Sequence, residues 1–71
     1  MTIHAFLKRR RELRGLTQAE VATLAETSTP TICNYETGTR TPSLDTLTRL
    51  ARVLRFSMGD LDRLTSKVVE G

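Results

Sequence analysis

Apolar residues recur along this chain at intervals of three and four, which is the spacing of one face of an α-helix. The clearest run comprises Leu44, Leu47, Leu50, Ala51 and Leu54. Strand-like alternation of apolar and polar residues is almost absent. The pattern therefore predicts an all-α protein.

The first two helices can be bounded from the sequence. A first helix ends at Gly15, and its inner face is assigned to Ile3, Phe6, Leu7 and Leu13. Thr17 and Glu20 have the spacing of a capping box, in which each side chain bonds the backbone N–H of the other. A short second helix follows, with an apolar stripe of Val21, Ala22, Leu24 and Ala25.

Residues 28–37, S-T-P-T-I-C-N-Y-E-T, form the third predicted helix. Ser28 is a favourable N-cap, and Pro30 fits the first turn, where its missing N–H costs nothing. Gly38 is placed to end the helix. Its inward-facing residues are Ile32 and Tyr35. The link to the preceding helix is brief and enforces a steep crossing.

Two further helices complete the prediction. A loop at 37–43 is rich in turn-forming residues, and Ser43 can cap the helix that follows. Ser57, with Asp60 at the third helical position, can cap a fifth helix, whose inner face carries Leu61 and Leu64. Residues 65–71 are expected to be a short tail. The predicted organisation is a single domain, 1–71, folded as a compact five-helix bundle.

Composition narrows the class of protein. Seventy-one residues, 38% hydrophobic and 27% charged, suit one small globular domain with a thin stability margin. One cysteine excludes an internal disulfide and a multi-cysteine metal site, and favours a reducing, cytoplasmic setting. No apolar run approaches the roughly 18 residues of a membrane span. The net charge of +3 is compatible with nucleic acid as a partner without requiring it.

Catalysis is not expected. Cys33 as a nucleophile would need a base, and the only histidine, His4, lies on another predicted helix. We expect His4 to face solvent, and we expect no metal or cofactor. The basic run at 8–11 points in all directions around a helix, so most of its charges face solvent, with a phosphate-binding patch as the alternative.

Two short helices joined by a tight turn within a bundle predict a helix-turn-helix, whose second helix can enter the major groove of DNA. The outward face of 28–37 carries Thr29, Pro30, Cys33, Asn34 and Thr37. Asparagine suits adenine, and small apolar groups suit the thymine methyl. Thr31 and the free N–H groups at the helix start could hold phosphate.

Three stretches together resemble one family of DNA-binding proteins. These are L-R-G-L-T-Q-A-E-V-A, S-T-P-T-I-C-N-Y-E-T-G and R-T-P-S-L-D-T-L-T-R-L-A, in that order. They resemble the lambda-repressor-like (Cro/XRE-type) family from about Leu7 to Leu64. The resemblance implies a five-helix bundle and a sequence-specific regulator of bacterial or phage origin that binds double-stranded DNA.

The resemblance also implies roles for individual residues. The implied base-reading residues are Thr29, Pro30, Cys33 and Asn34. The implied phosphate-binding residues are Gln18, Thr31, Thr37, Thr39, Arg40 and Ser43. A structural ion pair is expected between Arg11 and Glu36. Because no reading position carries arginine or lysine, the contacted base steps are expected to be rich in A·T.

A homodimer is expected, because a single module makes few base contacts, each worth roughly 1–3 kcal/mol. Two copies would read an inverted repeat with half-sites about 34 Å apart. The residues assigned to the interface are Arg55, Phe56, Met58 and Leu61; Phe56 and Met58 could instead close the core. With no room for a ligand domain, no small-molecule effector is expected. The alternatives are an antitoxin that binds a toxin protein, or a bundle that has lost DNA binding.

Overall fold

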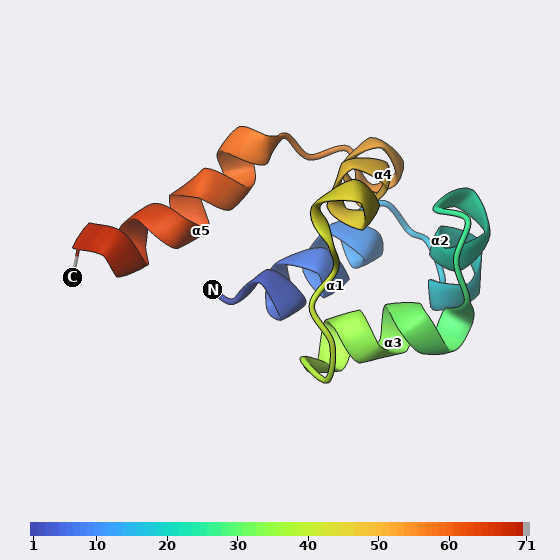
Figure 1. The fold of residues 1–71 in the computed structure, drawn as a ribbon. Helices are drawn as coiled ribbons and strands as arrows, with labels where there is room; N and C mark the ends of the chain where they lie inside the picture. Colours follow the sequence, from blue (N-terminus) through green and yellow to red (C-terminus); the bar gives the residue numbers. More distant parts are fainter. Residues whose placement is uncertain (71) are drawn as a thin grey trace.

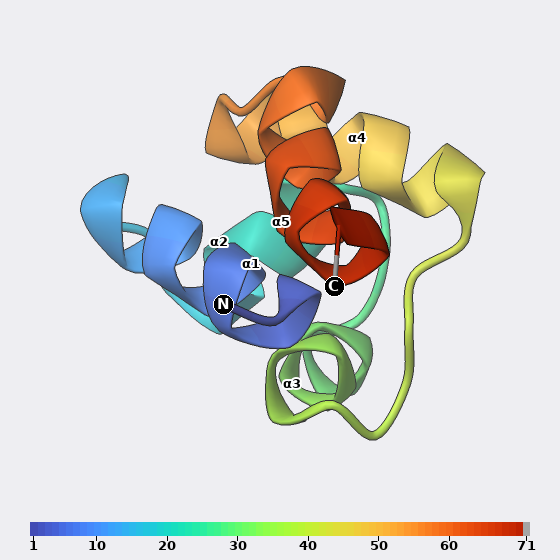
Figure 2. The same ribbon diagram turned by 90° about the vertical axis from the view of Figure 1, so that its left-hand side faces the viewer.

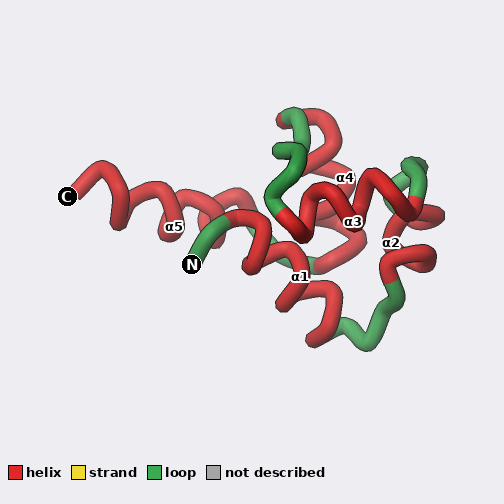
Figure 3. The backbone as a smooth tube through the Cα atoms, turned by 90° about the horizontal axis from the view of Figure 1, so that it is seen from below, coloured by secondary structure: helices red, strands yellow, loops and turns green. Residues whose placement is uncertain are grey.

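The computed structural model describes the backbone of residues 1–70 and the side chains of residues 1–64. The described chain contains five helices and no strand (Figures 1 and 3). The helices are α1 (Ile3–Leu13), α2 (Gln18–Leu24), α3 (Thr29–Thr37), α4 (Leu44–Leu54) and α5 (Met58–Glu70). The predicted all-α fold and its helix count are confirmed.

Side-chain caps begin the helices where the sequence predicted them. The capping box of α2 is complete: Glu20 N donates to Thr17 Oγ1 at 3.0 Å, and Thr17 N donates to Glu20 Oε1 at 2.8 Å. Ser28 and Ser43 likewise accept from backbone N–H groups in the first turns of α3 and α4. Caps of this kind are each worth about 1 kcal/mol, a large contribution for helices this short.

The fifth helix begins as predicted but runs further. Ser57 N and Ser57 Oγ donate to Asp60 Oδ2 at 2.9 and 3.2 Å. These two hydrogen bonds hold the pKa of the Asp60 carboxyl below its usual value. The helix then continues to Glu70, whereas a tail was predicted from residue 65. Neither glycine nor proline occurs between Gly59 and Gly71, so nothing in the sequence stops the helix there.

The core lies between the first four helices and is closed at one end by an aromatic pair. Its buried residues are Leu7, Val21, Ala22, Ala25, Ile32, Tyr35, Leu50, Leu54 and Phe56. The ring of Phe6 meets that of Phe56 edge to face, with centroids 5.1 Å apart. Because Phe56 precedes α5, this contact fastens the α4–α5 connection to α1. Beyond it, α5 projects from the bundle (Figure 1).

Three leucines expected on inner faces lie outside the core. Leu13, Leu24 and Leu44 are 64%, 59% and 74% exposed. Leu13 lies about 120° around the helix from Leu7 and is the last residue of α1, so it falls beyond the buried face. Leu44 is the first residue of its helix, and Leu24 is the last of α2, at the edge of its buried face. Spacing by three and four identified these helices, but it extended their buried faces too far.

The position on α1 that continues the buried face belongs to Arg10, three residues after Leu7. Its guanidinium donates to Leu54 O at 3.0 and 3.2 Å and to Arg55 O at 2.6 Å. These carbonyls end α4, where helical partners run out and a cation is favoured. Arg55 itself adopts a left-handed conformation, with φ 56°. Arg10 therefore stabilises the end of α4 and the reversal that leads to α5.

A matched pair of leucine substitutions tests this division of the apolar residues. Leu50→Ala removes a side chain that is 1% exposed and should cost about 2–5 kcal/mol of unfolding free energy. For a domain this small, that lowers Tm by roughly 10 °C or more. Leu13→Ala should change the unfolding free energy by no more than about 0.5 kcal/mol. Thermal and urea unfolding followed by circular dichroism measure both, and equal effects would contradict the assigned core.

Candidate nucleic-acid interface

The second and third helices pack closely across a short turn. Thr27 N donates to Ala22 O at 2.8 Å, and Glu26 takes a left-handed conformation with φ 58°, so the chain reverses within a few residues. The α3 helix then lies along one side of the molecule (Figure 2). Its inner side is fixed by Ile32 and Tyr35, which are 3% and 8% exposed. The opposite side of α3 is left free to meet a partner.

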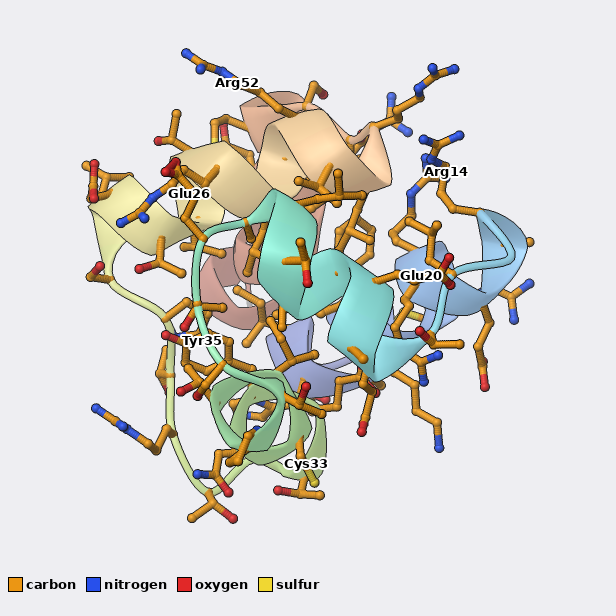
Figure 4. The ribbon with its side chains drawn as sticks, turned by 90° about the vertical axis from the view of Figure 1, so that its right-hand side faces the viewer. Arg14, Glu20, Glu26, Cys33, Tyr35 and Arg52 are labelled. Carbon is orange, nitrogen blue, oxygen red and sulfur yellow. The ribbon has the colours of Figure 1, made fainter. Side chains whose placement is uncertain are left out.

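The residues assigned to base reading lie on or beside that free side. Thr29 and Pro30 are exposed, and Cys33 and Asn34 are half-buried. Figure 4 shows Cys33 at the α3 side of the molecule. Within the described chain, none of these four side chains makes a hydrogen bond, so the Asn34 amide retains its full capacity to bond a base edge.

The hydroxyl groups assigned to phosphate contacts are already paired with neighbours. Thr31 Oγ1 lies 2.7 Å from Ser28 Oγ, and Ser43 Oγ lies 3.1 Å from that of Thr46. Thr37 Oγ1 lies 3.0 Å from Thr39 Oγ1. A phosphate oxygen only accepts, and each hydroxyl has one hydrogen to donate, so each of the first two pairs leaves one hydroxyl able to donate to phosphate. Because Thr37 also donates to Asn34 O, the hydroxyl hydrogens of Thr37 and Thr39 are both used within the protein.

The loop after α3 is folded back onto that helix. Gly38 takes φ 85°, and the N–H of Arg40 returns to Asn34 O at 3.2 Å. The Thr37 hydroxyl bonds the same carbonyl at 3.3 Å. Arg40 is exposed, so its charge is presented beside the end of α3.

A buried carboxylate joins three helices behind this surface. Glu36, with a side chain 5% exposed, accepts from Arg11 Nε at 2.6 Å and from Arg11 Nη2 at 3.1 Å. Gln18 Nε2 donates to the same carboxylate at 3.0 Å. The hydrogen bonds that Arg11 donates to the Glu36 carboxylate raise the pKa of Arg11 above its usual value. The pair expected between Arg11 and Glu36 is thus present, and the Gln18 amide is tied to it.

His4, which we expected to face solvent, packs against the end of α3 instead. Its Nδ1 lies 2.9 Å from Tyr35 O. The ring also covers Gly38, where an added Cβ would lie 3.2 Å from His4 Cδ2. The hydrogen bond runs to a backbone carbonyl, which carries no signature in the sequence. The prediction for His4 was therefore wrong.

The residues assigned to a dimer interface do not share one environment. Phe56 is 7% exposed and lies in the core against Phe6, so its ring has little surface left for a partner. Leu61 is partly buried against the same core. Met58 is 37% exposed, and Arg55 is exposed. Of the two roles considered for Phe56, the structure shows the core role.

The arginines labelled in Figure 4 lie away from α3. Figure 4 shows Arg14 and Arg52 on the side opposite α3, whose own residues include no lysine or arginine.

No cluster of histidine, cysteine and carboxylate side chains suited to a metal ion occurs among residues 1–64. In the part of the chain that the structure describes, no helix has the length and apolar character to cross a membrane.

Comparison with known proteins agrees with this geometry. The sequence model of the helix-turn-helix family matches residues 7–61, and the chain belongs to this family, in its lambda-repressor-like (Cro/XRE-type) form. It is a DNA-binding domain of a class that is typically not enzymatic.

Among solved structures, the chain is similar to one titled "SinR protein/SinI protein complex", with a TM-score of 0.78 and 26% identity. The match covers 84% of this chain but only 59% of that one. No curated protein sequence matches the chain significantly.

The buried ion pair generates a prediction about stability. Arg11→Met leaves the Glu36 carboxylate buried without its cation and should cost about 3–5 kcal/mol of unfolding free energy. Replacing both residues with methionine removes the orphaned charge and should recover most of that loss. Urea unfolding of the wild type and the two variants measures this. Additive losses in the double variant would contradict it.

Proposed function

We propose that this protein is a transcriptional regulator that binds a specific double-stranded DNA operator through α3. The observation that carries the proposal is the free side of α3, held out by a buried inner side and a fixed crossing with α2. A helix presented in this way can enter the major groove, which is about 12 Å wide.

The chemistry of α3 favours A·T steps at the contacted positions. Asn34 can bond adenine at N6 and N7, and its amide has no partner in the described chain. Thr29, Pro30 and Cys33 offer small apolar groups to the thymine methyl. Guanine readout by arginine has no source on this helix. Repression is the mode that we propose, since occupancy of an operator needs no further activity of the bound protein.

Phosphate contacts would supply the sequence-independent part of the affinity. Gln18 at the start of α2, Thr31 on α3 and Ser43 before α4 lie at the edges of the proposed surface, with Thr37, Thr39 and Arg40 at the end of α3. Each phosphate neutralised by a cation steepens the dependence of binding on salt. Because Arg40 is the one cation in this set, the salt dependence contributed by the set should be shallow.

A homodimer is part of the proposal, with α5 as its contact surface. That helix projects from the bundle (Figure 1). It begins at the partly exposed Met58, and the exposed Arg55 precedes it in the chain. Two copies related by a twofold axis would present two α3 helices to one inverted repeat, about one DNA turn apart. We place the protein in the bacterial cytoplasm, on the chromosome or a phage genome.

A protein partner is the second candidate. The similar SinR structure is by its title a complex with the SinI protein, which shows that a protein with this fold can occur in a protein complex. An antitoxin that binds a toxin would be such a case. Co-purification of a stoichiometric partner with the tagged chain would favour it.

Selection from a random duplex pool tests the DNA-binding proposal. We expect an inverted repeat that is rich in A·T at the contacted steps and bound at least ~10³-fold more tightly than scrambled DNA. Asn34→Ala should weaken binding by about 10-fold and relax the preference at one base pair in each half-site. Leu24→Ala, on the exposed edge of α2, serves as the control. Weak binding that ignores sequence would contradict the proposal.

Sedimentation equilibrium tests the dimer. Wild-type protein should approach the mass of two chains as its concentration rises. Met58→Glu should shift the protein toward monomer, because it places a charge in the proposed contact. Leu24→Glu introduces the same charge on α2 and should leave the mass unchanged. A wild type that stays monomeric on the operator as well as in solution would rule out this interface.

A further inference from the structure

The Gln18 amide is oriented by the acceptor it faces. A carboxylate can only accept hydrogen bonds, so the Gln18 atom 3.0 Å from Glu36 Oε1 must be the nitrogen. One of the two N–H groups of Gln18 is thereby committed, and the carbonyl oxygen is turned away from Glu36. The half-buried side chain keeps one N–H for a group outside the protein.

The acceptor is itself rigidly held. Glu36 receives two hydrogen bonds from the guanidinium of Arg11, and Arg11 Nη1 also donates to Leu16 O at 2.9 Å. The side chains of Arg11 and Glu36 are 14% and 5% exposed. Arg11 on α1 and Glu36 on α3 are thus fixed, and the hydrogen bond to Glu36 restricts the rotation of the Gln18 side chain before any ligand binds.

The charge of the network matters as well. A carboxylate so close to Gln18 would repel a phosphate if it were unpaired. Arg11 neutralises it at 2.6 Å and removes that repulsion. The pair thus supplies a strong acceptor on the inner side of Gln18 without adding net negative charge behind it.

We propose that Glu36 is a positioning residue for DNA binding: it holds the Gln18 amide so that its remaining N–H meets one phosphate of the operator. Glu36 does not touch DNA. This inference rests on the proposed function, and it assigns Glu36 a role beyond the structural one expected from the sequence. A hydrogen bond to a charged phosphate makes a contribution equivalent to about 10-fold in affinity.

The test compares Gln18→Ala, the double variant Arg11→Met/Glu36→Met, and all three substitutions combined, on the selected operator at one salt concentration. Gln18→Ala and the double variant should each lose about 10-fold in affinity. The combined variant should lose no more than either. Val53→Ala trims a partly buried side chain on α4 and lowers stability without touching the network, so its affinity should stay at the wild-type value.

A second readout separates positioning from a structural role. Operators that carry one neutral methylphosphonate at a time should reveal one phosphate per half-site whose replacement weakens the wild type. Gln18→Ala and the double variant should both become insensitive at that same phosphate. A double variant that binds as the wild type does, or losses that multiply in the combined variant, would overturn the proposal.

Folding of the double variant is checked by circular dichroism, and wild-type NMR provides a measurement that does not depend on it. One of the two Gln18 side-chain amide protons should exchange with solvent more slowly than the other, and more slowly than those of Asn34, in the free protein. Equally rapid exchange of both Gln18 protons would overturn the proposal. If the wild type selects no operator, the DNA-binding proposal fails with this one; if it selects one, only the positioning role is at stake.

Discussion

The carboxylate of Glu36 holds the arrangement of the first three helices. It accepts hydrogen bonds from Arg11 at the end of α1 and from Gln18 at the start of α2, while it belongs to the last turn of α3. Among residues 1–64, whose side chains the structure describes, the core has nine buried residues, which leaves these helices few other constraints on their relative rotation. Because an apolar contact is not directional and a charged hydrogen bond is, this network adds a directional constraint to the orientation of α3 that the buried Ile32 and Tyr35 favour.

The remaining elements are fixed by other contacts of the same kind. Caps set where the helices begin, and Arg10 holds the end of α4 by bonding the carbonyls of Leu54 and Arg55. His4 fastens the far end of α3 through Tyr35 O. Short helices are marginal in isolation, so these contacts at the helix ends add to the stability that the packed interior supplies.

The sequence predicted the helices well because their signals are local. Thr17, Ser28, Ser43 and Ser57 act over three residues, and each marks a helix start that the structure confirms. The free side of α3 followed from the same spacing. Contacts between side chains and distant backbone carbonyls could not be predicted, which is why the role of His4 was missed. One signal in the sequence pointed to a special role for Arg10, namely its place three residues after Leu7. No signal in the sequence indicated that it bonds the carbonyls of Leu54 and Arg55.

The left-handed residue between α4 and α5 has a consequence for the DNA rather than for the fold. Arg55, with φ 56°, sets the direction in which α5 leaves the bundle, and Arg10 holds that geometry. In a dimer built on α5, this single torsion would govern the angle between two protomers and thus the separation of their α3 helices. The number of base pairs between operator half-sites would then be encoded by a residue outside the reading surface. An operator with altered spacing could be matched by changing this hinge and leaving every DNA contact in place.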